Sequence, residues 1–136
     1  MRNSFIIVKF NQTKKRGITM IPKFMLKKLY VENSLKQDGN KITFQMLNNL
    51  YPGTVIGAKH IKIDELEFDL AKIEVTFNDE KIVVAEISEE KPFSLTKGVT
   101  FTFHIEGCIQ PGKHTIDLNF LTKEAGTIAF EIEDEF

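Results

Sequence analysis

The feature that most limits the fold of this chain is an alternation of apolar and polar residues with a period of two. In "VTFTFHIE" (99–106), every second residue is Val, Phe or Ile, and Thr, His or Glu lies between them. The same pattern returns in "KITFQM", "HTIDLNF" and "TIAFEIE". Because successive side chains of a strand point to opposite faces, the pattern predicts strands with one buried face, in mainly antiparallel sheets.

Turn-forming sequences separate these segments at short intervals. They are "QDGN" (37–40), "FNDEK" (77–81), "QPGK" (110–113) and "TKEAGT" (122–127). Asp-Gly tolerates the positive φ of tight hairpins, and Pro-Gly fixes φ at one turn position while leaving the next one free. Eight or nine short strands joined in this way predict an all-β, two-layer antiparallel β-sandwich of the immunoglobulin-like class. Only "IPKFMLKKL" (21–29) has helical spacing, and Pro22 argues against a long helix there.

Charge divides the chain into a basic start and an acidic remainder. Residues 1–19 carry five basic residues and no acidic one, and the formal total is −1, so residues 20–136 carry about −6. The apolar run "FIIV" is shorter than a signal-peptide core of roughly 7–15 residues. We therefore expect a basic amino-terminal extension or extra strand at 1–19, followed by one β-sandwich domain at 20–136. The five basic residues are Arg2, Lys9, Lys14, Lys15 and Arg16.

Composition argues against several classes of partner. One short basic cluster on an acidic body does not favour nucleic-acid binding, and no apolar run approaches the roughly 20 residues that span a membrane. The single cysteine, Cys108, excludes an intrachain disulfide and any Cys-rich metal site. These features favour a cytoplasmic protein without a cofactor, in which Cys108 is a packed or half-buried thiol.

The segment "NNLYPGTVIG" (48–57) holds the densest Gly and Pro punctuation of the first half of the chain. A phosphate-binding loop needs several glycines that lead into the amino terminus of a helix. Here "AKHIKIDEL" follows, which has strand spacing and no helix cap. We therefore predict a turn or an irregular crossover at one end of the sandwich.

Histidine and carboxylate side chains are the remaining candidates for chemistry. His60, His104 and His114 lie on different expected strands and lack a short paired spacing, so surface or hairpin-end positions are expected for them rather than a zinc site. Acidic residues gather in "IDELEFD" (63–69) and "EIEDEF" (131–136), and we interpret both groups as solvated faces. No catalytic or metal-ligating residue is assigned.

Two segments carry a family resemblance. "NNLYPGTVIGAKHIKIDELEF" together with "QPGKHTIDLNF" resembles the small β-sandwich proteins related to the beta subunit of C-glycoside deglycosidases. That resemblance implies a non-catalytic subunit, which associates with a barrel subunit of the sugar-isomerase type that carries the metal and the catalytic base. It also implies contacts to the partner from the loop, and the local candidates are Asn49, Tyr51, Thr54 and Ile56.

A second resemblance concerns the end of the chain. Short chains that end like "LTKEAGTIAFEIEDEF" are similar to proteins that carry a hydroxymethylglutaryl-CoA reductase label. We find neither a nicotinamide-binding fold nor the Lys, Asp, His and Glu constellation of that activity, so we interpret the label as a naming error.

Two classes of function follow. The first is a non-catalytic accessory or partner-binding protein, which forms a homo-oligomer or a hetero-complex with a barrel enzyme. The alternative is a small metal-dependent lyase or hydrolase that uses the histidines, or a self-assembling protein.

Overall fold

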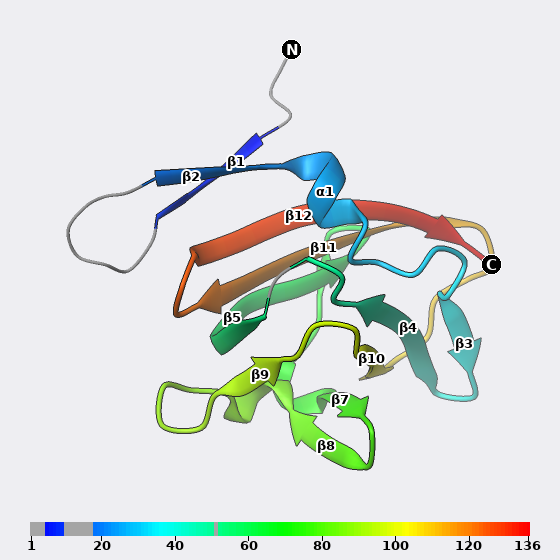
Figure 1. Ribbon diagram of the computed structural model, residues 1–136. Coiled ribbons are helices and arrows are strands. Elements are labelled where there is room, and N and C mark those ends of the chain that lie inside the picture. The colour runs from blue at the N-terminus through cyan, green and yellow to red at the C-terminus, as the bar shows by residue number, and fades with distance from the viewer. Residues whose placement is uncertain (1–4, 10–17, 51) are drawn as a thin grey trace.

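Two five-stranded antiparallel sheets form the body of the protein (Figure 1). The computed structural model describes residues 5–9, 18–50 and 52–136. Buried residues from both sheets form a common hydrophobic core. The expected all-β sandwich is therefore confirmed, with ten strands in the two sheets in place of the eight or nine expected.

The first sheet has the strand order β3–β4–β10–β7–β8. Its strands are β3 (Lys36–Asp38), β4 (Lys41–Leu47), β10 (Thr100–Glu106), β7 (Ile73–Phe77) and β8 (Glu80–Val83). The second sheet has the order β12–β11–β5–β6, and β9 pairs with the start of β5. Its strands are β12 (Gly126–Glu135), β11 (Lys113–Thr122), β5 (Gly53–Ile63), β6 (Leu66–Glu67) and β9 (Phe93–Leu95).

The connectivity is that of an immunoglobulin-like sandwich. In that class, strands A, B, E and D form one sheet and strands C, F and G form the other. Here β3, β4, β10 and β7 occupy the first four places, and β5, β11 and β12 occupy the other three. The two short strands β6 and β9 both pair with β5, one near each end of it.

The alternation in the sequence places the core where it was expected. Along β4, Ile42 and Phe44 are completely buried, and the residues between them are half-buried. On the neighbouring strand β10, the ring of Phe103 stacks on Phe44 with 4.9 Å between the ring centroids. Stacked aromatic pairs of this kind add to the free energy gained by burying their area. The period-two pattern is therefore the main source of the fold.

β5 is longer and less regular than expected, since the sequence indicated a strand over roughly 58–63 only. Its pairing with β11 shifts register at two places, between Asn119 and Phe120 and again between Leu121 and Thr122. Each shift adds one residue to β5 that has no partner opposite it, as in a β-bulge. The extra residues are Lys59 and Ile56, so Val55, Ile61 and Ile63 all remain in the core.

The predicted hairpin turns are confirmed. The turns after β3, β7 and β11 lie within "QDGN", "FNDEK" and "TKEAGT", and "QPGK" lies in the connection from β10 to β11. The chain before β3 is irregular. Asn33 adopts a φ of 64°, which turns the chain there. Before this turn Tyr30 forms an isolated bridge to Met46 of β4, and after it Lys36–Asp38 forms the strand β3.

The amino-terminal part adds a hairpin and one helix. β1 (Phe5–Lys9) pairs with β2 (Ile18–Pro22), and β1 lies beside β12 (Figure 1). β2 leads into α1 (Lys23–Lys27), the short helix that the spacing of 21–29 permits. "FIIVK" (5–9) thus forms a strand, while Arg2, Lys14, Lys15 and Arg16 lie outside the described residues, and the domain boundary at residue 20 stays a prediction.

Two short 3-10 helices complete the described chain, η1 (Leu70–Lys72) and η2 (Val84–Glu86). In the part of the chain that the structure describes, no helix has the length and hydropathy needed to cross a membrane.

Candidate functional site

The two ends of the sandwich differ in chemistry. At one end β4 and β11 finish and β5, β10 and β12 begin; we call it the cavity end. At the other end β5 finishes, at the Asp64–Glu65 turn, and β11 begins; we call it the polar end. Since both ends gather segments that are far apart in the sequence, each is a candidate site.

The cavity end contains an apolar cavity of about 530 Å³ between the two sheets. Helix α1, the crossover from β4 to β5, η2, β9 and the β11–β12 hairpin surround it. Pockets for small molecules have volumes of roughly 300–1,000 Å³ and mainly apolar walls. The apolar lining residues include Met25, Leu26, Leu29, Met46, Leu50, Val55, Val75, Val84, Ile87, Phe93, Leu95, Phe101, Phe103, Phe120, Ile128 and Phe130.

Polar groups hold the rim of this cavity in place. The backbone N–H and the hydroxyl of Thr54 donate to the two carboxylate oxygens of Glu124, at 2.9 and 2.8 Å. The N–H of Lys123 donates to the carbonyl of Thr54 at 2.9 Å. Three hydrogen bonds therefore join the start of β5 to the β11–β12 turn. Partial burial raises the pKa of Glu124, but the bonds from Thr54 lower it, and the net result lies below its ordinary value.

The predicted crossover at 48–57 is confirmed, because the chain passes here from the first sheet to the second (Figure 1). Buried Asn48 orders it: its amide donates to the carbonyl of Leu95 at 3.0 Å and its oxygen accepts from the N–H of Leu50. The crossover lies on the rim of the cavity, to which Leu50, Pro52 and Gly53 contribute. The Gly- and Pro-rich segment of the sequence therefore lies next to the apolar cavity.

The four residues predicted to contact a partner have different surroundings. Asn49 is exposed, and its amide lies 3.5 Å from the carbonyl of Lys28. The hydroxyl of Thr54 is already bonded to Glu124. Ile56 is half-buried at a register shift of β5, and Tyr51 lies outside the described residues. The structure thus places Asn49 and Thr54 at the cavity end, and their contact role stays a prediction.

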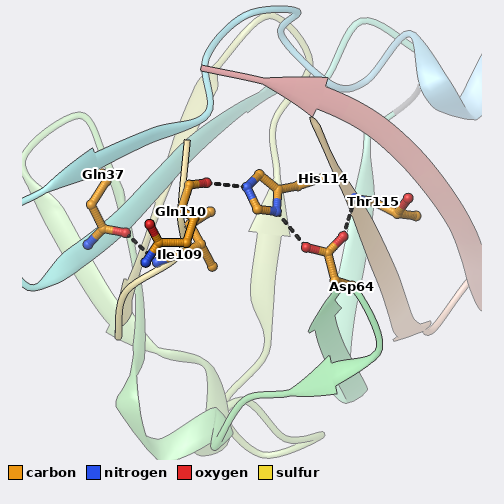
Figure 2. A network of polar contacts seen from close by, with 6 residues as sticks. All are labelled: Gln37, Asp64, Ile109, Gln110, His114 and Thr115. Carbon is orange, nitrogen blue, oxygen red and sulfur yellow. Dashed lines mark hydrogen bonds and ion pairs between the residues drawn. The ribbon is translucent and has the colours of Figure 1, made fainter. Parts of the chain in front are cut away.

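His114 organises the polar end (Figure 2). Its Nδ1 lies 2.5 Å from a carboxylate oxygen of Asp64, and its Nε2 lies 2.6 Å from the carbonyl oxygen of Gln110. Both partners accept hydrogen bonds, so this geometry favours the imidazole with protons on both ring nitrogens, which is the positively charged form. The ring of Phe136 stacks on it with 5.9 Å between the centroids, which brings the end of the chain to the site.

These contacts shift both ionisable groups toward their charged forms. Burial lowers the pKa of His114, but the hydrogen bonds to Asp64 and Gln110 raise it, and the net value lies above the ordinary one. The N–H of Thr115, at 2.9 Å, and then His114 hold the pKa of the Asp64 carboxyl below its usual value. Opposite charges and charge-assisted hydrogen bonds explain both directions.

The backbone of the turn that carries Asp64 is unusual. Asp64 and Glu65 both adopt positive φ, 53° and 69°, in the two-residue connection between β5 and β6. Such a turn matches the twist of a hairpin but normally favours Asn, Asp or Gly, so Glu65 is a costly choice. The bonds of Asp64 to β11 help to hold the turn in this conformation.

Gln37 connects the first sheet to the same end. Its side-chain oxygen accepts from the N–H of Ile109 at 2.8 Å (Figure 2). Its amide donates to the carbonyl of Gly107 at 2.9 Å. The loop after β10 is thereby fixed against β3. We interpret the polar end as a structural network that closes the sandwich.

The three histidines are not brought together. His60 pairs with Asp117 at 3.1 Å on β5 and β11, and His104 bonds to the hydroxyl of Thr76 at 3.1 Å on the first sheet. His114 occupies the hairpin end as expected, but it is buried rather than on the surface, because Phe136 covers it. In residues 5–9, 18–50 and 52–136, no group of three or more His, Cys, Asp or Glu side chains is placed to hold a metal ion.

Two expectations about polar side chains are wrong. Asp134, in the acidic end of the chain, is buried; it accepts from the hydroxyl of Tyr30 at 2.6 Å and from the N–H of Leu35 at 3.1 Å. Burial raises the pKa of Tyr30, and Asp134 raises it further. Cys108 is exposed rather than packed, because it follows the end of β10 and lies in the loop, 3.5 Å from the side-chain oxygen of Asn40.

Sequence reasoning missed the Asp64–His114 pair and the cavity. The pair joins residues 50 positions apart, and its only local signal was "IDEL", an acidic dipeptide between two strand-like segments. The cavity has no local signal, because its walls come from both sheets.

Comparison with known proteins adds one finding. A family model described as "Hydroxymethylglutaryl-CoA reductase, N-terminal domain" matches residues 25–136, a range that includes all ten strands of the two sheets. No curated protein matches the chain.

Proposed function

Because this chain belongs to the hydroxymethylglutaryl-CoA reductase N-terminal domain family, we propose that it is a non-catalytic β-sandwich that binds the polypeptide carrying the catalytic residues. Family membership corrects our interpretation of that name as a naming error. The matched family is defined as a domain, which agrees with an accessory role and does not require catalytic residues in this chain.

The observation that carries the proposal is the exposure of two apolar side chains on segments that line the cavity, α1 and the crossover. Phe24, on α1, is 58% exposed, and Pro52, on the crossover, is also exposed. The crossover lies next to the residues that follow α1, since the side-chain amide of Asn49 lies 3.5 Å from the carbonyl of Lys28. Aromatic side chains are frequent anchors of protein interfaces, and the neighbouring Asn49 supplies an exposed amide.

Two kinds of partner are expected. The name of the matched family indicates a hydroxymethylglutaryl-CoA reductase polypeptide. The resemblance to C-glycoside deglycosidase beta subunits, which rests on the quoted motifs alone, indicates a barrel of the sugar-isomerase type. In either complex, Asn49, Tyr51, Thr54 and Ile56 are the proposed contact residues of the loop.

Affinity isolation from the native host tests the proposal. The tagged full chain is used to recover proteins from an extract, and mass spectrometry identifies those present in comparable amount. We expect one catalytic polypeptide with the wild type and a loss of at least tenfold with Phe24→Asp. Leu66→Asp is a matched control, because Leu66 is 59% exposed and lies at the polar end.

The identity of the recovered protein decides between the two partners. Recovery of this chain alone contradicts the accessory role and leaves self-association. Equal recovery with Phe24→Asp and with wild type contradicts the choice of the cavity end as the contact surface.

A further inference from the structure

The cavity between the sheets has the size and the opening to the surface that a ligand site requires. Most hollows inside protein cores are too small for more than one water molecule, whereas this one measures about 530 Å³. Two of its lining residues, Pro52 and Glu124, are exposed. The cavity therefore reaches the surface between the crossover and the β11–β12 turn.

The inner walls offer apolar contacts and few polar ones. Besides Glu124, the polar side chains of the lining are Asn48 and Thr122. The amide of Asn48 donates to Leu95, and the hydroxyl of Thr122 donates to the carbonyl of Gly126 at 2.9 Å. Because these groups are already bonded within the protein, the body of a bound molecule gains mainly by removing its apolar surface from water.

The rim adds a charge. Glu124 is the one charged side chain among the lining residues, and its hydrogen bonds to Thr54 keep it ionised at neutral pH. An anionic head group near this carboxylate is repelled, whereas an alcohol or an ammonium group donates a hydrogen bond to it. Lys123 is exposed beside it but does not line the cavity.

We propose that this cavity binds an elongated apolar small molecule whose head group is uncharged or cationic, such as a long-chain alcohol or amine. The apolar chain lies between the two sheets, and the head group lies at Glu124, between the crossover and the β11–β12 turn. This site goes beyond the accessory role and does not require a partner, because all of its walls belong to this chain.

Isothermal titration of the full chain with 1-decanol, decylamine and decanoate, each below its critical micelle concentration, tests the proposal. We expect one molecule of 1-decanol or decylamine per chain. Decanoate should bind roughly five- to tenfold more weakly, as a like charge at about 4 Å in water costs about 1 kcal/mol. Glu124→Gln retains partners for both Thr54 groups and should remove the difference between the three ligands.

Substitutions that fill the cavity locate the site. Ala125→Phe, on the β11–β12 turn, and Leu50→Trp, on the crossover, both add volume to the lining at half-buried positions. Each should weaken 1-decanol binding at least tenfold with its circular dichroism spectrum unchanged. Ala71→Phe is the control, because Ala71 is exposed on η1 outside the lining. Absence of binding by all three ligands, binding unaffected by both filling variants, or tighter binding of decanoate overturns the proposal.

Discussion

His114 shows how a single buried side chain can make stability depend on pH. Its ring is covered by Phe136 and lies between two hydrogen-bond acceptors, Asp64 and the carbonyl of Gln110. The His114 ring therefore binds its proton more tightly in the folded protein than in the unfolded chain, so the pKa of His114 is raised. A raised pKa contributes stability below the ordinary value of 6.5, and this contribution is lost as pH rises through the folded value.

Replacing His114 by Gln tests this at the residue scale. At pH 5.5 we expect the free energy of unfolding to fall by about 1 kcal/mol, since Asp64 is 48% exposed and water screens the pair. The difference from wild type should shrink as pH rises toward 8.5. Asp64 acts in the opposite direction, because its lowered pKa contributes stability above its ordinary value of 3.8, and that part is lost in acid. Urea unfolding at several pH values measures both effects, the loss of the His114 contribution at high pH and the loss of the Asp64 contribution in acid.

His104 provides a control of opposite sign. Burial lowers its pKa, so its contribution is present above 6.5 and is lost as pH falls. His104→Gln should therefore differ from wild type more at high pH than at low pH. A deficit of His114→Gln that stays constant from pH 5.5 to 8.5 contradicts the protonated assignment.

At the scale of elements, the amino-terminal hairpin is the part whose role is most open to experiment. β12 is the last strand of its sheet, and β1 lies beside it. An uncovered edge strand presents unpaired backbone groups and favours association with other chains. We therefore predict that β1 protects this edge, either within its own subunit or in a neighbouring one.

A chain that begins at Met20 lacks β1 and part of β2. It should melt at a lower temperature than the full chain and have a changed oligomeric mass. A chain that begins at Phe5 keeps both strands and is the control. An unchanged melting temperature and an unchanged mass, measured by calorimetry and light scattering, would count against the protective role and in favour of a separate extension at 1–19.

The elements that could be predicted from the sequence depend on local signals. The strands β4, β10, β11 and β12 follow from alternation, and the turns follow from Gly, Pro, Asn and Asp at positions that require their backbone preferences. The two register shifts of β5 could not be predicted, because they arise from its pairing with β11. Gly57 and Ala58, between the shifts, weaken the alternation and hide the first half of the strand.

The candidate site could be predicted only in part, for a similar reason. Pro52 and Gly53 pointed to the crossover, which does lie at the rim of the cavity. The pairing of Glu124 with Thr54 and the burial of His114 and Asp134 depend on contacts between distant segments, so neither could be predicted from neighbouring residues.

At the scale of the whole molecule, we assign a structural role to the polar end and a binding role to the cavity end. A hydrogen-bond network closes the polar end. In it His114 bonds to Asp64 and to the carbonyl of Gln110, and Gln37 accepts from the N–H of Ile109. The cavity end has an apolar interior, with Asn49 and Pro52 exposed on the crossover and Phe24 exposed on α1. We therefore propose that binding takes place at the cavity end.

Hydrogen–deuterium exchange of the full chain with and without saturating 1-decanol tests that claim most directly, because it reports both ends in one experiment. We predict slower exchange in residues 48–50, 52–55, 93–95 and 122–125, which border the cavity, and unchanged exchange in residues 37–41 and 63–66. Protection confined to the polar end, or no protection at either end, would contradict the account.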